Sequence, residues 1–241
     1  MSDKISNRFN IQQTVLFIFS TFLSISLLAQ DTATIRPPVT YKWRIYRKQA
    51  EQDSTKRMTE LKSLMPNLVY DLRYASTNNF MHRLMYPANT THTFLRAPAA
   101  NALQKVQLEL NEKGLGLKIF DAYRPYSVTV KFWELVKDER YVANPAKGSG
   151  HNRGIAVDLT VINLKTGEEL NMGTGFDKFS DTAHQTFTNL PEEILQNRYL
   201  LKSTMEKYGF KALDTEWWHF FLNNANRFEL LDIDFKKLIK E

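Results

Sequence analysis

The sequence predicts an α+β fold in which helices flank a central, largely antiparallel sheet. Segments with apolar residues at helical spacing alternate along the chain with short segments in which apolar and polar residues alternate, the period of a strand. Neither the G-x-G-x-x-G pattern nor the phosphate-binding loop of nucleotide-binding folds occurs. The composition, 43% hydrophobic and 24% charged, is that of an ordinary globular protein.

The first thirty residues have the pattern of a signal peptide. Lys4 and Arg8 precede a stretch from Phe9 to Gln30 without charge, and Ala29 offers a small residue for cleavage. Its apolar part is shorter than the ~20 residues of a spanning helix. We therefore expect export to the periplasm or cell envelope with cleavage near Ala29, and retention as an N-terminal anchor stays open.

The charge balance excludes one class of partner. The net charge of +6 is mild, and the basic residues form no stripe with interleaved aromatic residues, so a nucleic-acid partner is not expected. No membrane partner is expected beyond the N-terminal segment. The chain has no cysteine, which excludes disulfides and thiolate metal ligands.

The first half of the folded region contains a strand, a helix and a strand. Residues 68–75 alternate as a strand does. Residues 98–113 have Leu103, Val106 and Leu110 at helical spacing, with Gly114 just past the end. The next strand, over 117–120, leads into a turn that Pro125 closes.

The second half repeats this alternation. Ser127 is expected to cap a helix whose apolar face is Val128, Phe132, Leu135 and Val136. A strand over 155–161 is expected to have one face in the core. A loop over 165–190, a helix from Pro191 to Tyr208 and an aromatic strand in TEWWHFFL follow, and the last fourteen residues stay unassigned.

A histidine and an aspartate frame the first chemical motif, SGHNRGIAVD. Gly150 and Gly154 flank His151 and allow the chain to turn its imidazole toward the following strand, where Asp158 lies among apolar residues. A buried carboxylate needs a partner or a metal ion. Asp158 on a solvated strand face and His151 as a surface residue are the alternatives.

The second motif, EWWH, completes a metal-binding set. A zinc hydrolase requires three protein ligands and one open position, which His151, Asp158 and His219 provide with one Zn²⁺ per chain. Glu216 then remains free to act as general base and acid. Because residues three apart point to opposite sides of a regular strand, we expect a bulge or bend there. A core strand with a hydrogen-bonded histidine is the alternative.

A third motif, DAYRP, follows the strand over 117–120. Arg124 can stabilise the negative charge of a transition state, and Asp121 can orient Arg124 or a ligand histidine from behind. An ordinary salt bridge is the alternative. His82, His92 and His184 are interpreted as surface or hydrogen-bonded residues, with His184 the nearest candidate for contact with the site.

These motifs, in this order, resemble the zinc D-Ala-D-Ala peptidases, and most closely the D-Ala-D-Ala dipeptidases of the vancomycin-resistance type. The stretches YDLRYASTNNF and MGTGFDKFSDTAH are also similar to dipeptidase segments, and the likeness covers roughly residues 65–225. The resemblance implies a hedgehog-like fold and the hydrolysis of D-Ala-D-Ala to two D-alanines, in peptidoglycan turnover or recycling.

The resemblance also implies roles for individual residues. His151, Asp158 and His219 bind zinc, Glu216 is the general base and acid, Arg124 stabilises the transition state, and Ser149 lies near the substrate.

The expected organisation is then a signal peptide or anchor over 1–30, a connector and collar over 31–64, and a catalytic domain over 65–241. Two other functions stay open. One is a D,D-carboxypeptidase or wall endopeptidase with the same zinc site, and the other is a zinc-stabilised wall-binding module without activity.

Overall fold

The computed structural model describes residues 37–223 and 227–240 of the chain. They belong to a unit that extends from Thr34 to Glu241. The expected signal peptide over 1–30 lies outside the described residues. Among the residues that the structure describes, no helix has both the length and the apolar character needed to cross a membrane.

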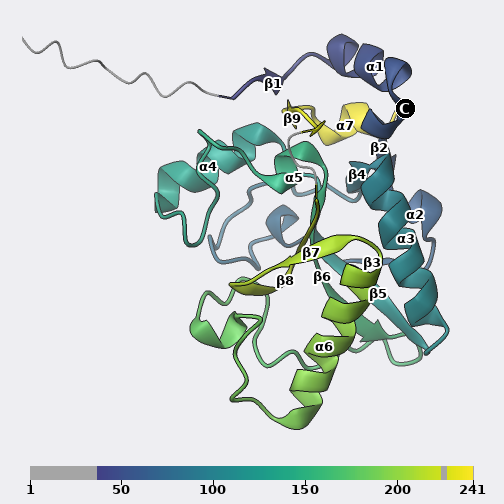
Figure 1. Ribbon diagram of the computed structural model, residues 1–241. Helices are drawn as coiled ribbons and strands as arrows, with labels where there is room; N and C mark the ends of the chain where they lie inside the picture. Colours follow the sequence, from purple (N-terminus) through teal and green to yellow (C-terminus); the bar gives the residue numbers. More distant parts are fainter. Residues whose placement is uncertain (1–36, 224–226, 241) are drawn as a thin grey trace, which may run out of the picture. The chain divides into compact units, whose positions relative to one another are not determined.

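A five-stranded sheet forms the centre of this unit, with the strand order β3–β5–β6–β8–β7 (Figure 1). The strands are β3 Val69–Tyr70, β5 Leu115–Asp121, β6 Ala156–Asn163, β7 Phe210–Leu213 and β8 Glu216–Leu222. Three of the pairings are antiparallel, and β3 pairs with β5 in parallel. The predicted α+β fold with a largely antiparallel sheet is therefore confirmed.

Two short strand pairs and seven helices complete the described part. The pairs join β1 Val39–Thr40 to β9 Leu230–Leu231, and β2 Met58–Glu60 to β4 Phe94–Arg96. The helices are α1 Trp43–Gln52, α2 Leu61–Leu64, α3 Ala97–Asn111, α4 Tyr126–Val136, α5 Gly150–Arg153, α6 Glu192–Lys207 and α7 Phe235–Leu238. Short 3-10 turns cover Ser54–Lys56, Arg73–Ala75 and Asp181–Ala183.

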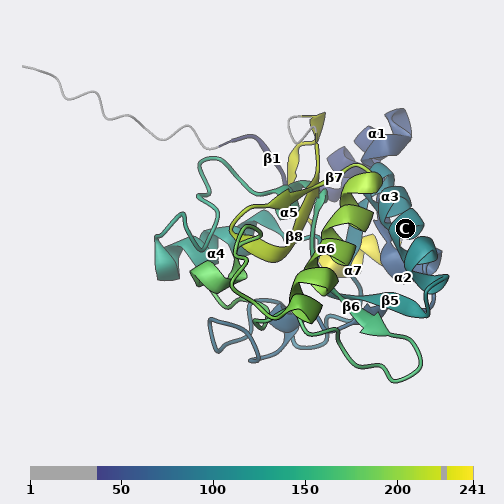
Figure 2. The ribbon, with the colours of Figure 1, turned by 60° about the horizontal axis from the view of Figure 1, so that its bottom comes forward.

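The two long helices, α3 and α6, pack side by side against the sheet, as Figures 1 and 2 show from two directions. Leu103 and Leu110 of α3 share a buried core with Leu201 of α6 and with Val157 and Leu159 of β6. Pro98 lies in the first turn of α3, and Gly114 adopts a positive φ of 71° just beyond it. The predicted helix over 98–113 is thus confirmed.

The structure differs from the expectation for β6. Every residue from Ala156 to Ile162 is buried, so both faces of this strand are covered, not one. On the second face α5 approaches so closely that a Cβ atom on Gly150 would lie 2.9 Å from the Cβ of Ala156. Asp158 is only 3% exposed, which excludes the alternative of a solvated carboxylate.

Helix α4 is capped differently from the expectation. Ser127 lies inside the helix, and Pro125 occupies the position before it. The Ser127 N–H and hydroxyl donate to Oδ1 of Asp232, at 3.0 and 2.8 Å, so a residue distant in sequence performs the capping. Leu135, expected on the buried face, is 48% exposed.

The predicted strand over 68–75 is mostly wrong. Only Val69 and Tyr70 pair with the sheet, and the chain turns into a 3-10 helix at Arg73. This turn buries Tyr74 in a second core beside Phe132 of α4. The last fourteen residues, left unassigned, contain β9 and α7.

Candidate active site

The register of three neighbouring strands brings the central acids and one histidine together. Asp121 at the end of β5 pairs with Asp158 near the start of β6, and Asp158 pairs with His219 on β8. The β5–β6 register shifts between Ile119 and Asp121, which places Asp121 directly opposite Asp158. Residues separated by almost one hundred positions thus form one row across the sheet.

Strand β8 contains the predicted irregularity. Ala212 of β7 pairs with Phe220, but the next residue, Leu213, already pairs with Glu216. Residues 217–219 of β8 therefore have no partner on β7, although His219 still pairs with Asp158 of β6. With this bulge in β8, Glu216 and His219 face the same region despite their odd spacing. Their nearest side-chain atoms, Oε2 and Nδ1, are 4.0 Å apart.

His151 reaches the row from the one-turn helix α5. Ser149 caps this helix by accepting the His151 N–H, and Gly154 ends it with a φ of 70°. The imidazole Nδ1 is 2.7 Å from the carbonyl oxygen of Ala122. Because a carbonyl only accepts, Nδ1 carries the proton and Nε2 presents its lone pair to the site.

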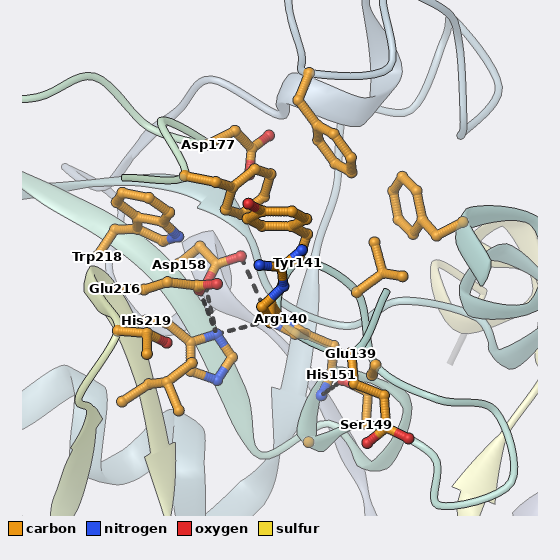
Figure 3. A pocket seen from close by; sticks show the side chains of 18 of the residues that line it. Glu139, Arg140, Tyr141, Ser149, His151, Asp158, Asp177, Glu216, Trp218 and His219 are labelled. Carbon is orange, nitrogen blue, oxygen red and sulfur yellow. Dashed lines mark hydrogen bonds and ion pairs between the residues drawn. The ribbon is translucent and has the colours of Figure 1, made fainter. Parts of the chain in front are cut away.

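Three side chains converge at a common point (Figure 3). Nε2 of His151 is 3.2 Å from Nδ1 of His219, which is 2.8 Å from Oδ1 of Asp158. The candidate ligand atoms all lie within 4.8 Å of one another. Two imidazole nitrogens that face each other beside a carboxylate need a proton or a cation between them. A donor set of two imidazoles and one carboxylate fits Zn²⁺.

The electrostatics keep Asp158 ionised. Burial by itself raises the pKa of this carboxyl, but His151 and His219 outweigh burial through charge and hydrogen bonds and hold the pKa below its usual range. Asp158 in turn raises the pKa of His219 against the lowering effect of burial. A permanent anion between two imidazoles is therefore built into the sheet.

Glu216 is the titratable acid of the site. Its side chain is 14% exposed and borders the cavity. Burial raises the pKa of Glu216 to about 7, with His219 and Arg124 opposing and Asp158 reinforcing the shift. Near neutral pH, Glu216 can therefore both accept and donate a proton.

Arg124 is held by Asp121, as predicted. Nη2 and Nε of Arg124 donate to Oδ2 of Asp121 at 2.7 and 3.0 Å. The other oxygen of Asp121 accepts the hydroxyl of buried Tyr86 at 2.6 Å. Asp121 orients Arg124 and not His151: its Oδ2 is 3.7 Å from Nδ1 of His151, which donates to the Ala122 carbonyl instead.

His151, Asp158, His219, Glu216 and Arg124 all line one cavity of about 590 Å³. Ser149 and His184 line it, as expected for residues near the site, and Ser149 is 9% exposed. Much of the remaining wall is aromatic, and the aromatic residues that line the cavity are Tyr74, Phe80, Phe132, Tyr141, Phe179 and Trp218. Polar and charged side chains form the rest of the wall, and a concave pocket of this size that combines aromatic walls with convergent polar groups has the character of a small-molecule site.

Three acidic residues of this cavity, Asp177, Glu139 and Asp181, were not predicted from the sequence, and Asp177 is the most buried of them. It lies in the loop between β6 and α6, has the unusual φ of 60° and accepts the hydroxyl of Tyr74 at 3.2 Å from each carboxylate oxygen. Burial raises the pKa of Asp177 well above its usual value, reinforced by Asp158 and opposed by Arg124. The stretch MGTGFDKFSDTAH contained this residue, but its spacing gave no sign of the role.

The family model described as D-ala-D-ala dipeptidase matches residues 54–240, which is more than half of the chain. The chain belongs to this family of metallopeptidases. A D-alanyl-D-alanine dipeptidase of Escherichia coli (strain K12) is 34% identical over 77% of this chain and 94% of its own length. A D-alanyl-D-alanine dipeptidase of Enterococcus faecalis is 30% identical over 67% of this chain and 89% of its own length.

Solved structures are only distantly similar to this chain. An LD-carboxypeptidase of known structure aligns with a TM-score of 0.36 and 22% identity, over 56% of this chain and 63% of its own. That similarity is too low to add to the assignment. Family membership itself confirms the predicted fold family and the prediction of a peptidase, against the alternative of an inactive wall-binding module.

Proposed function

We propose that the protein is a zinc-dependent dipeptidase that hydrolyses D-Ala-D-Ala to two D-alanines. The observation that carries this proposal is the convergence of His151, Asp158 and His219 beside a free acid, Glu216, in one cavity. The names of the relatives support the choice of substrate, since both are called D-alanyl-D-alanine dipeptidase.

The zinc ion would be held by Nε2 of His151, Nδ1 of His219 and a carboxylate oxygen of Asp158, one ion per chain. When bound, zinc acidifies a coordinated water and polarises the carbonyl of the scissile peptide bond. The Ala122 carbonyl fixes the tautomer of His151 for this purpose. An aspartate ligand also leaves the site less positive than a third histidine would.

Glu216 would move the proton. With a pKa raised to about 7, its carboxylate takes a proton from the attacking water and its acid form returns that proton to the departing amine nitrogen. Its Oε2 lies 4.0 Å from Nδ1 of His219, and Glu216 is not one of the three residues whose candidate ligand atoms converge, which supports the role of a free acid beside the ligands.

Arg124 would stabilise the carbonyl oxygen as negative charge develops on it. Its guanidinium is 8% exposed, lines the cavity and is fixed by Asp121 before any substrate arrives. A pre-positioned permanent cation stabilises the transition state without reorganisation during the reaction.

Asp177 would bind the free amino terminus of the substrate. A part-buried carboxyl with a raised pKa becomes ionised when an ammonium group arrives, and Tyr74 holds that carboxyl in position. Ser149 offers its hydroxyl hydrogen, for which no acceptor exists among the described residues, to an oxygen of the substrate. A demand for a free amino group distinguishes a dipeptidase from a carboxypeptidase that accepts longer chains.

The proposed location is the cell envelope, on the pattern of residues 1–30 alone. There the enzyme would meet D-Ala-D-Ala released from peptidoglycan, which makes turnover or recycling the proposed role. Fractionation of cells that express the full chain, compared with a chain that lacks 1–30, tests the location.

The proposed activity is tested with a panel of peptides. The purified protein should hydrolyse D-Ala-D-Ala, and a chelator should abolish the activity until zinc is restored. L-Ala-L-Ala tests stereochemistry, and N-acetyl-D-Ala-D-Ala tests the need for a free amino group. Faster cleavage of blocked or longer D,D-peptides would instead assign the carboxypeptidase function.

A further inference from the structure

A group of basic residues lies outside the active site, on the elements at the two ends of the described chain. A surface groove is lined by residues of α1, of α7 and of the segments beside them. We call this lining the basic face, and it consists of Tyr41, Lys42, Trp43, Arg44, Arg47, Glu51, Arg57, Lys237 and Lys240. It shares no residue with the lining of the active-site cavity.

The basic face carries charge that the protein does not neutralise. Six of its residues are lysine or arginine and one is an acid. Of the six, only Arg47 has an ion-pair partner within the described residues, Glu51 at 3.2 Å. Some lysines elsewhere do have such a partner, as Lys118 has in Glu169 and Lys207 in Glu109. Unpaired cations gathered on one face favour an anionic partner.

Exposed apolar side chains accompany these cations. Tyr41 and Trp43 line the groove together with the lysines and arginines, and Tyr41 is 56% exposed. Aromatic groups mixed with lysine and arginine are typical of surfaces that lie in the headgroup region of a bilayer. A nucleic-acid duplex, with its bases stacked inside, offers no apolar layer to receive these side chains, so a lipid surface fits better than a duplex.

The position of the basic face in the chain agrees with a membrane partner. Ten residues, 31–40, lie between the end of the uncharged stretch at Gln30 and Tyr41. Ten residues span at most about 36 Å when extended. If that stretch stays in a membrane, the linker keeps Tyr41 within that distance of the membrane. If the stretch is removed, the basic face alone supplies the attraction.

We propose that the basic face binds the surface of a bilayer that contains anionic phospholipids. This proposal is independent of the proposed activity, and it adds a membrane contact to the expected N-terminal segment. Each lysine or arginine near such a surface strengthens binding about fivefold, so the reversal of three charges should lower binding at least about 100-fold.

The test is co-sedimentation of the full-length protein with vesicles. One set contains phosphatidylcholine alone and the other contains about 30% phosphatidylglycerol, both at about 0.05 M salt, where charge attraction is only partly screened. The test variant is R44E/K237E/K240E. The matched control, K105E/K165E/K211E, reverses three exposed lysines on other elements.

We expect the wild type and the control variant to prefer the anionic vesicles, and the test variant to lose that preference. Binding to neutral vesicles, which reports the N-terminal stretch, should be the same for all three. Equal losses in the test and control variants, or no preference in the wild type, would overturn the proposal. Tighter binding to a DNA duplex than to anionic vesicles, at equal concentrations of phosphate charge, would also overturn the proposal. Thermal melting checks that each variant is folded.

Discussion

The substitution Asp177→Asn tests how the cavity recognises its substrate. In the wild type the hydroxyl of Tyr74 lies 3.2 Å from each carboxylate oxygen of Asp177. Asparagine has almost the same shape as aspartate, and its side-chain oxygen can still accept this hydrogen bond. The substitution therefore removes the negative charge and leaves the packing intact. Any loss reports the charge alone.

The magnitude follows from where Asp177 lies. An ion pair at about 4 Å in a protein environment gains roughly 4 kcal/mol. Burial raises the pKa of the Asp177 carboxyl, so its ionisation costs free energy that offsets part of this gain. An ammonium group left without its partner in a part-buried site costs about 3 kcal/mol or more. We therefore expect kcat/KM for D-Ala-D-Ala to fall about 100-fold.

The assay compares free D-Ala-D-Ala with N-acetyl-D-Ala-D-Ala for the wild type and Asp177→Asn. The wild type should strongly prefer the free dipeptide, and the variant should lose most of that preference. Tyr74→Phe, which removes only the hydroxyl, serves as the control and should cost far less. If the wild type cleaves both peptides at similar rates, or if Asp177→Asn keeps its rate on the free dipeptide, Asp177 does not bind the amino terminus.

Three further predictions concern single residues. Glu216→Gln should abolish turnover and keep zinc bound. Base catalysis needs the ionised form of Glu216, and burial raises the pKa of this residue to about 7, so kcat/KM of the wild type should rise with pH up to about 7 and then level off. A flat profile from pH 5 to 8 would contradict this role of Glu216. Arg124→Ala should lower kcat by about 10²- to 10³-fold, and Arg124→Lys should recover part of the loss, which steady-state kinetics measures. Asp232→Ala removes the hydrogen-bond acceptor for Ser127 at the start of α4. This substitution should lower the free energy of unfolding, measured by denaturant titration, by about 1 kcal/mol and leave kcat unchanged. An unchanged free energy of unfolding would show that the capping contact does not stabilise the fold.

The parts of the site that follow from local pattern could be predicted from the sequence. His151 lies in a glycine-flanked turn, Asp158 interrupts an apolar strand, and His219 follows Glu216 in an aromatic run. Each of these polar residues is unusual in its local sequence context, and together they provide the ligands and the free acid that zinc hydrolysis requires. The bend in β8 could also be predicted, because Glu216 and His219 cannot share a face of a regular strand.

The parts that depend on distant contacts could not be predicted. Asp177 lies in a long loop, and only the packing of that loop over Tyr74 brings its carboxyl into the cavity. The Ala122 carbonyl, which fixes the tautomer of His151, is a backbone atom and leaves no trace in the sequence. Asp232 replaces Ser127 as the cap of α4 from more than one hundred residues away.

The most direct test of the central claim is the zinc content of the purified protein and four variants. After removal of all metal and titration with zinc, the wild type and Glu216→Gln should each bind one ion per chain with similar affinity. His151→Ala, Asp158→Asn and His219→Ala should each bind at least about tenfold more weakly. Loss of zinc in Glu216→Gln, or wild-type affinity in His151→Ala, would contradict the assignment of ligands and of the free acid.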